Sequence, residues 1–204
     1  MHAGFASAAD LKQTQLNGTL PVLYVFLARA GCTIDSVTPV ALDSAGNFVS
    51  EGKRTTPGVK IVFFSPSGKE QTLYYFTSDL ADWAIKANPG FVKFCEQQGQ
   101  GVTLLKAASY LMHSNNFSQV RDFLLTHSKV ILQDDSGIPF RFFDAHKWDL
   151  RLYGRYHGPI NRFKEHPQPD LAKADAESKP APLEFSFGYQ WQPSRSSLMV
   201  ATPK

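Results

Sequence analysis

A four-residue connection, Pro66–Lys69, restricts the fold of this chain more than any other part of its sequence. It joins two strand-like runs, Val59–Ser65 and Gln71–Thr77, in which β-branched and aromatic residues are frequent. Proline, serine and glycine in so short a connection are typical of a β-hairpin loop. The two strands of a hairpin pair antiparallel, so we predict an antiparallel sheet in this part of the chain.

Similar runs occur towards both ends of the chain. Leu20–Ala28 is short and apolar, and with Pro21 at its start it favours a central strand that is buried on both faces. Val130–Gln133 and Ile138–Phe143 flank the turn-forming sequence Asp134–Gly137, which predicts a second hairpin. Three more strands are expected at Leu150–Tyr156, Leu183–Tyr189 and Ser197–Ala201.

Residues 78–128, between these groups of strands, have a helical period. Asn88, which a proline follows, predicts the start of one helix. We expect a second helix over 103–112, capped by its first threonine, and a third in which Asn116 and Gln119 form a capping box. The predicted order is therefore strands, then a block of helices, then strands again.

These elements predict an α+β fold, with a mostly antiparallel sheet and a central helical block packed on one face. The 204 residues, of which 43% are hydrophobic, can bury one sizeable core. We therefore predict a single domain over 1–204. Within it, 1–19 is expected to be a loosely ordered leader, and 167–182 a surface segment with a short helix at Asp170–Ala176.

Charge and cysteine content argue against several classes of partner. The net charge of +3 comes from 21 basic and 18 acidic residues, so the chain has no strong field to attract nucleic acid. The two later helices could form a helix-turn-helix, but only Arg121 is expected on the surface of the second. Cys32 and Cys95 form no CxxC motif, and their pairing stays open. No apolar run approaches the ~18 residues that a membrane-spanning helix needs.

No catalytic or cofactor motif is present in the sequence. The pairs Gly52-Lys53 and Gly68-Lys69 lack the spacing of a phosphate-binding loop, and no G-x-S-x-G occurs. The six histidines show no H-x-x-x-H spacing, so we predict no cofactor and no metal. Asp134 and Asp135 are adjacent carboxylates, for which a role in shaping the turn is favoured over acid–base catalysis.

One region combines basic and aromatic residues and is a candidate binding surface. Within Arg141–His166, the residues Arg151, Tyr153 and Arg155 fall on one face of the predicted strand, because side chains alternate with a period of two. Cations beside aromatic rings suit anionic, carbohydrate or peptide ligands. The alternative is that the aromatic rings face the core and the basic side chains face solvent.

Seven phrases of this sequence resemble the carboxy-terminal part of a family of uncharacterised bacterial exported proteins, often described as lipoproteins. The phrases are LPVLYVFLAR (Leu20–Arg29), QTLYYFTSDL (Gln71–Leu80), LLKAASYL (Leu104–Leu111), VRDFLL (Val120–Leu125), ILQDDSGIPFRFF (Ile131–Phe143), GRYHGPINRF (Gly154–Phe163) and PLEFSFGY (Pro182–Tyr189). The resemblance implies an exported protein, periplasmic or anchored to a membrane as a lipoprotein in its full-length form. It implies no activity, cofactor or catalytic residue. Family members are longer and begin with an export signal, and no such signal is expected within these 204 residues.

These observations favour a non-catalytic binding or interaction domain of the bacterial cell envelope, with an unidentified ligand or protein as its partner. The alternative is a hydrolase whose site is assembled in the fold from Asp134, Asp135, His146 or His157. A role in assembly, through an exposed aromatic patch, is a third hypothesis.

Overall fold

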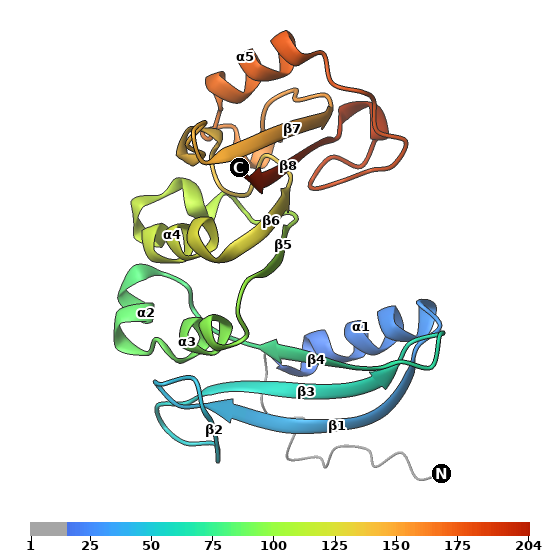
Figure 1. The fold of residues 1–204 in the computed structure, drawn as a ribbon, viewed down its shortest axis with the longest axis vertical. Coiled ribbons are helices and arrows are strands. Elements are labelled where there is room, and N and C mark those ends of the chain that lie inside the picture. Colours follow the sequence, from blue (N-terminus) through green and yellow to red (C-terminus); the bar gives the residue numbers. More distant parts are fainter. Residues whose placement is uncertain (1–15) are drawn as a thin grey trace. The chain divides into compact units, whose positions relative to one another are not determined.

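The structure, a computed structural model, describes residues 16–204 and divides into two compact units. The first unit contains 16–79 and 87–97, and the second contains 80–86 and 98–204. Each unit is built on its own four-stranded sheet (Figure 1). The predicted α+β class is confirmed, with two sheets in place of one. The single domain expected over 1–204 stays a prediction.

The first unit combines an antiparallel sheet with two helices. Its elements are α1 (Leu16–Arg29), β1 (Thr33–Leu42), β2 (Phe48–Val49), β3 (Thr56–Phe64), β4 (Glu70–Phe76) and α3 (Gly90–Gln97). The strands lie in the order β2-β1-β3-β4, and every pairing is antiparallel. The predicted hairpin joins β3 to β4: the Ser65 amide donates to the carbonyl of Lys69 over 2.9 Å, and Gly68 turns the chain with a φ of 77°.

Helix α1 replaces the strand predicted at Leu20–Ala28, and that prediction is wrong. Its apolar residues recur every three or four positions, so Leu20, Leu23 and Leu27 pack together against Val59 and Ile61 of β3. A short apolar run does not distinguish a buried strand from a buried helix by periodicity alone. Most of the expected leader lies outside the described residues, whereas 16–19 form the first turn of α1.

An aromatic cluster forms on the first sheet around Tyr74 and Phe76 of β4. Phe48 of β2 and Phe94 of α3 complete it, with the Tyr74 and Phe94 ring centroids 5.3 Å apart. Gly58 of β3 lies under the Phe76 ring, where a Cβ atom would approach a ring carbon to 2.3 Å. A glycine is therefore required at this point of the strand so that the ring can lie flat on the backbone.

Substituting Gly58→Ala should lower the free energy of unfolding of the first unit by about 1–3 kcal/mol, because the new methyl group would displace the Phe76 ring. The matched control is Gly18→Ala in α1, where a Cβ atom meets nothing within 4 Å. That substitution should leave stability unchanged or raise it by up to ~1 kcal/mol, because alanine favours helix. Urea unfolding followed by far-ultraviolet circular dichroism measures both. Equal effects of the two substitutions would contradict the steric explanation.

The second unit contains a mixed sheet and three α-helices. Its longer elements are α2 (Asp82–Ala87), β5 (Gly101–Leu105), α4 (Ser118–His127), β6 (Ser128–Gln133), β7 (Trp148–Gly154), α5 (Pro169–Ser178) and β8 (Ser197–Pro203). Short 3-10 turns are η2 (Leu111–His113), η3 (Asn115–Phe117), η4 (Phe140–Phe142), η5 (Asn161–Phe163) and η6 (Pro193–Arg195). The strand order is β5-β6-β8-β7, with β5 parallel to β6 and the other pairs antiparallel.

Two predicted elements of the second unit are wrong. The helix expected over 103–112 is strand β5 followed by a loop, and the second hairpin does not form because 138–143 is an irregular segment containing η4. Gln133, the last residue of β6, accepts a hydrogen bond from the Ile138 amide and donates one to its carbonyl, over 2.9 and 2.6 Å. A side chain thus replaces the strand partner that a hairpin would have supplied.

The segments near the carboxy terminus follow the predictions in part. The short helix expected at Asp170–Ala176 is confirmed as α5. Gln168, Leu171 and Asp175 are buried, whereas most other residues of 167–182 are exposed, so the description of 167–182 as a surface segment stays a prediction. The strand expected at Leu183–Tyr189 is a loop, whereas those expected near 150–156 and 197–201 are β7 and β8.

Helix α4 is capped from a distance and carries a buried cation. Asp82 accepts hydrogen bonds from the Ser118 hydroxyl and the Gln119 amide, over 2.5 and 2.9 Å, where the sequence predicted a local capping box. Arg121 is only 5% exposed, donates to the Met112 carbonyl over 2.9 Å and lies 3.8 Å from the centre of a phenylalanine ring. Its predicted place on the helix surface is therefore wrong.

Candidate functional site

The two adjacent carboxylates lie at the end of β6 and are almost completely buried. Asp134 is 3% exposed and Ser136 is inaccessible to solvent. The Ser136 hydroxyl donates to Asp134 Oδ1 over 2.7 Å, and the amides of Ala107 and Ala108 donate to Asp134 and Ser136 over 3.2 and 2.6 Å. The turn therefore holds the loop that follows β5, rather than facing solvent.

That loop has an unusual backbone. Ala107, Ser109 and Tyr110 have φ values of 54–55°, in the left-handed region that residues with a Cβ atom rarely adopt. Three further hydrogen bonds fix it: the Tyr110 hydroxyl donates to Asp135, the Ser109 and Tyr189 hydroxyls are 2.7 Å apart, and Tyr189 donates to the Ala107 carbonyl over 3.1 Å. A strained backbone persists only where its surroundings determine it, so this cluster is the first candidate for a site.

Aromatic rings surround the Tyr110 side chain. His166 stacks on it with ring centroids 5.3 Å apart, and His113 and Phe163 pack at 5.0 and 5.1 Å. Tyr110 is only 2% exposed, so these rings close the site. Neither histidine was predicted as a site residue, and no spacing in the sequence signals that they meet.

The titration of these groups follows from their burial. Burial raises the pKa of Asp135 to about 6, against the hydrogen bond from Tyr110, which lowers it. Burial and the bond to Asp135 raise the pKa of Tyr110. Burial, followed by the charge of His166, lowers the pKa of His113 to about 4, so that its imidazole is neutral at pH 7. The cluster thus contains acid–base groups that solvent scarcely reaches.

A cavity of about 20 Å³ adjoins the two carboxylates, which is room for one water molecule. Asp135, Tyr156, Gln168 and Asp175 contribute to its lining. The Gln168 side chain donates to the Asp135 carbonyl over 2.7 Å and accepts from the Phe140 amide over 2.8 Å. The polar groups around this cavity therefore bond to one another and connect the loops of the second unit.

The residues proposed for a hydrolase do not all converge on this cavity. Asp134 and Asp135 line it, whereas His146 and His157 are exposed and are not among its lining residues. Within 16–204, no group of three or more His, Cys, Asp or Glu side chains could hold a metal ion.

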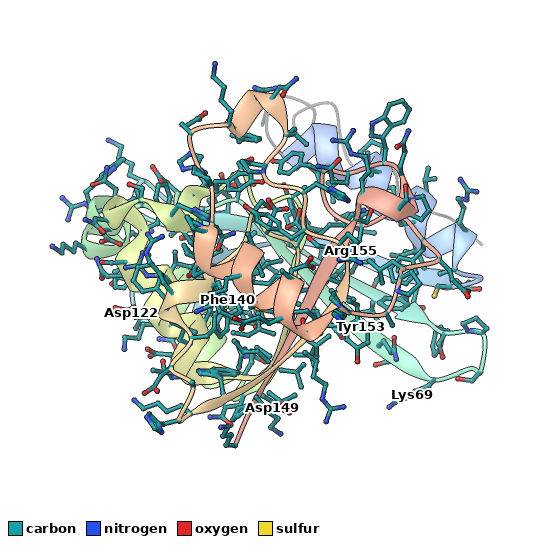
Figure 2. All side chains as sticks on the ribbon, turned by 90° about the horizontal axis from the view of Figure 1, so that it is seen from above. Lys69, Asp122, Phe140, Asp149, Tyr153 and Arg155 are labelled. Carbon is teal, nitrogen blue, oxygen red and sulfur yellow. The ribbon has the colours of Figure 1, made fainter. Side chains whose placement is uncertain are left out.

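The candidate binding residues of β7 separate in the structure. Arg151 and Tyr153 lie on one face of the strand, opposite Val200 and Leu198 of β8. Gly154 ends the strand with a φ of 76°, and Arg155 beyond it lies 3.9 Å from the carboxylate of Asp175. Figure 2 labels Tyr153 and Arg155 at this end of β7, and Asp149 near the other end.

The face that carries Arg151 and Tyr153 is apolar over most of its width. We call it the open face; it consists of Val102 and Leu104 of β5, Val130 and Leu132 of β6, Leu198, Val200 and Thr202 of β8, and Asp149, Arg151 and Tyr153 of β7. One cross-strand row runs through Leu104, Leu132 and Val200 to Arg151. The opposite face is the core, where Ile131 and Ala201 are inaccessible to solvent.

The apolar part of the open face is most exposed at its β5 edge. Val102 is 67% exposed and Leu104 is 61% exposed, whereas Leu132 and Val200 are half-buried. This face was not predicted, because Leu104 was assigned to the helix over 103–112 and Val102 to no strand. The sequence of the strand, Gly-Val-Thr-Leu-Leu, does not alternate clearly between apolar and polar residues, so it carries no signal for a strand with one exposed face.

Comparisons with known proteins do not identify the chain. No protein-family model, curated protein or solved structure matches it. The resemblance to exported bacterial proteins therefore stays a prediction. In the part of the chain that the structure describes, no helix is long and apolar enough to span a membrane.

Substituting Tyr110→Phe should lower the free energy of unfolding of the second unit by about 1–3 kcal/mol, because Asp135 loses its buried donor. All three tryptophans of the chain, Trp83, Trp148 and Trp191, belong to this unit, so tryptophan fluorescence during urea unfolding reports on it. Tyr153→Phe, at a half-exposed tyrosine of the same unit, should change stability by less than about 0.5 kcal/mol. Equal losses would show that the Tyr110 hydroxyl has no special role.

Asp135→Asn should become more stable relative to the wild type as the pH rises from 4 to 7. The folded pKa of about 6 lies above the ~3.9 of an unfolded aspartate, so the wild type loses stability over this range as the buried carboxyl ionises. The asparagine variant has no such loss, and the difference should change by on the order of 1–2 kcal/mol. The lowered pKa of His113 makes stability rise with pH, the opposite direction. This contribution is the same in both proteins, so it cancels in the difference between them. A difference that stays constant with pH would contradict the prediction.

Proposed function

We propose that this chain is a non-catalytic interaction module whose contact surface is the open face. The observation that carries the proposal is the cross-strand row Leu104, Leu132 and Val200 ending on Arg151. An antiparallel sheet normally presents polar side chains on its solvated face. Burying apolar surface stabilises a complex by roughly 25 cal/mol per Å², and exposed apolar patches mark interaction sites.

The form and charge of the open face favour a protein partner. A flat row of aliphatic side chains suits the apolar centre of a protein interface, whereas small molecules bind in deep pockets. Arg151 Nε lies 3.5 Å from Asp149 Oδ2, and both side chains are more than half exposed. Such a surface pair contributes at most about 1 kcal/mol, so a carboxylate of the partner can replace Asp149 at little cost.

The cellular setting of this module is the bacterial cell envelope, and the resemblance of the sequence to exported proteins supports it. The hydrolase hypothesis has less support. Asp134 and Asp135 hold loops in place through their hydrogen bonds, and the exposed His146 and His157 supply no base beside them. A catalytic base must come within hydrogen-bond reach of the proton that it removes.

Photo-crosslinking tests the contact surface. A photoreactive amino acid at Thr202, on the open face, should give one discrete adduct with another protein in cells of the source organism. Arg151→Glu should reduce that adduct at least about tenfold, because the carboxylate of the partner would face a like charge. Mass spectrometry of the adduct identifies the partner and the site of attachment.

The matched control is charge reversal elsewhere in the same unit. Lys173→Glu, on the exposed side of α5, should leave the adduct unchanged. A photoreactive residue placed at Lys173 should give no such adduct. If no adduct forms at Thr202, or if Arg151→Glu and Lys173→Glu have equal effects, the open face is not the contact surface.

A further inference from the structure

Among the strands of residues 16–204, β5 is an edge of the second sheet and pairs only with β6. The direction of its free hydrogen-bonding groups follows from one contact beyond the strand end. The Asp134 amide donates to the Leu105 carbonyl over 3.2 Å, so the backbone groups of Leu105 face β6. Backbone groups alternate in direction along a strand, so Thr103 also faces β6. The N–H and C=O groups of Val102 and Leu104 therefore point away from the sheet.

This edge lacks the features that normally prevent strands from pairing with other chains. Its sequence, Gly-Val-Thr-Leu-Leu, has no charge and no proline. The other edges differ: β7 carries Asp149 and Arg151, β4 begins with Glu70, and β2 is only two residues long. Val102 and Leu104 are also the most exposed apolar side chains of the open face. β5 is thus the least protected edge in the described part of the chain.

We propose that β5 pairs antiparallel with β5 of a second copy of this chain, about a two-fold axis at Thr103. In this register Val102 lies opposite Leu104 of the second copy, and Leu104 opposite its Val102. Each opposite pair exchanges two backbone hydrogen bonds, which makes four in total. All four outward groups of each copy are then satisfied.

Self-complementarity favours a second copy over another partner for this edge. The five residues are uncharged, so the two-fold axis brings no like charges together. On the open face, Val102 of each copy packs against Leu104 of the other, and the apolar rows of the two copies become continuous across the interface. The sheet would then have eight strands, with β7 and its charged residues at both ends.

The expected dimer is transient. One pair of five-residue strands buries less than the ~1,200 Å² of a standard interface, so association should depend on concentration. Sedimentation equilibrium over a wide range of protein concentration should show a monomer converting to a dimer. Amide exchange should show protection of Val102 and Leu104 that increases with concentration, while Thr103 and Leu105 are protected throughout.

Leu104→Pro is the test variant, because it removes one outward donor that the β5–β6 pairing does not use. It should abolish the dimer while the circular dichroism spectrum and the thermal midpoint of the monomer stay close to those of the wild type. Leu104→Ala, which keeps the donor, should retain concentration-dependent protection of the Val102 and Leu104 amides. Thr72→Pro on the edge strand β4 is the control at another edge and should leave dimerisation unchanged.

Three results would overturn the proposal. One is a monomer at every concentration, another is a dimer that Leu104→Pro does not weaken, and the third is concentration-independent exchange of the Val102 and Leu104 amides. These measurements use the purified chain alone. They are therefore separate from crosslinking at Thr202, which can succeed or fail whether or not the chain dimerises.

Discussion

The arrangement of the second unit depends on hydrogen bonds made by the buried turn that begins at Asp134. Asp134 and Ser136 hold the loop after β5, and Asp135 receives the Tyr110 hydroxyl. On the other side, Gln168 connects the Asp135 carbonyl to the amide of Phe140. Buried polar groups without partners cost about 1–3 kcal/mol each, so these bonds have to form together. These side-chain hydrogen bonds take the place of strand pairing, so long irregular segments of the second unit can pack over its core.

The same turn accounts for the strain stored nearby. Three residues with left-handed backbone angles precede η2, and each is tied to a buried side chain or to Tyr189. Gly188 approaches Asp134 so closely that a Cβ atom would lie 2.1 Å from its carboxylate. Only glycine permits this approach, and its φ of 71° also favours glycine. Asp134, although a carboxylate of the kind found in catalytic sites, thus holds the backbone of this loop in place.

The proposed interaction surface is the open face, on the side of the second sheet opposite its core. One face buries Ile131 and Ala201 completely, while the other presents the aliphatic row that ends on Arg151. Because β5 is an edge strand and carries the most exposed apolar side chains of that face, both its side chains and its outward backbone groups are accessible. The proposed partner contact uses the side chains of the face, and the proposed dimer uses the backbone of the edge.

The features that depend only on neighbouring residues could be predicted from the sequence. The hairpin at Pro66–Lys69, the start of α3 near Asn88 and the helix α5 are local, because turn geometry, capping and period are set within a few positions. Leu20–Ala28 was ambiguous, and only packing against Val59 and Ile61 made it helical. The second hairpin failed because the Gln133 side chain took the place of a strand.

Tertiary structure alone decided the site. Tyr110, His113 and His166 are brought together by loops whose course depends on Asp134 and Gln168, and no local pattern encodes such long-range bonds. Arg151 and Tyr153 were found from the period of two, which a strand fixes by itself. Arg155 was grouped with them because the positive φ of Gly154 is invisible in a sequence pattern. The apolar rows beside Arg151 became visible only when four strands, distant in sequence, were aligned in one sheet.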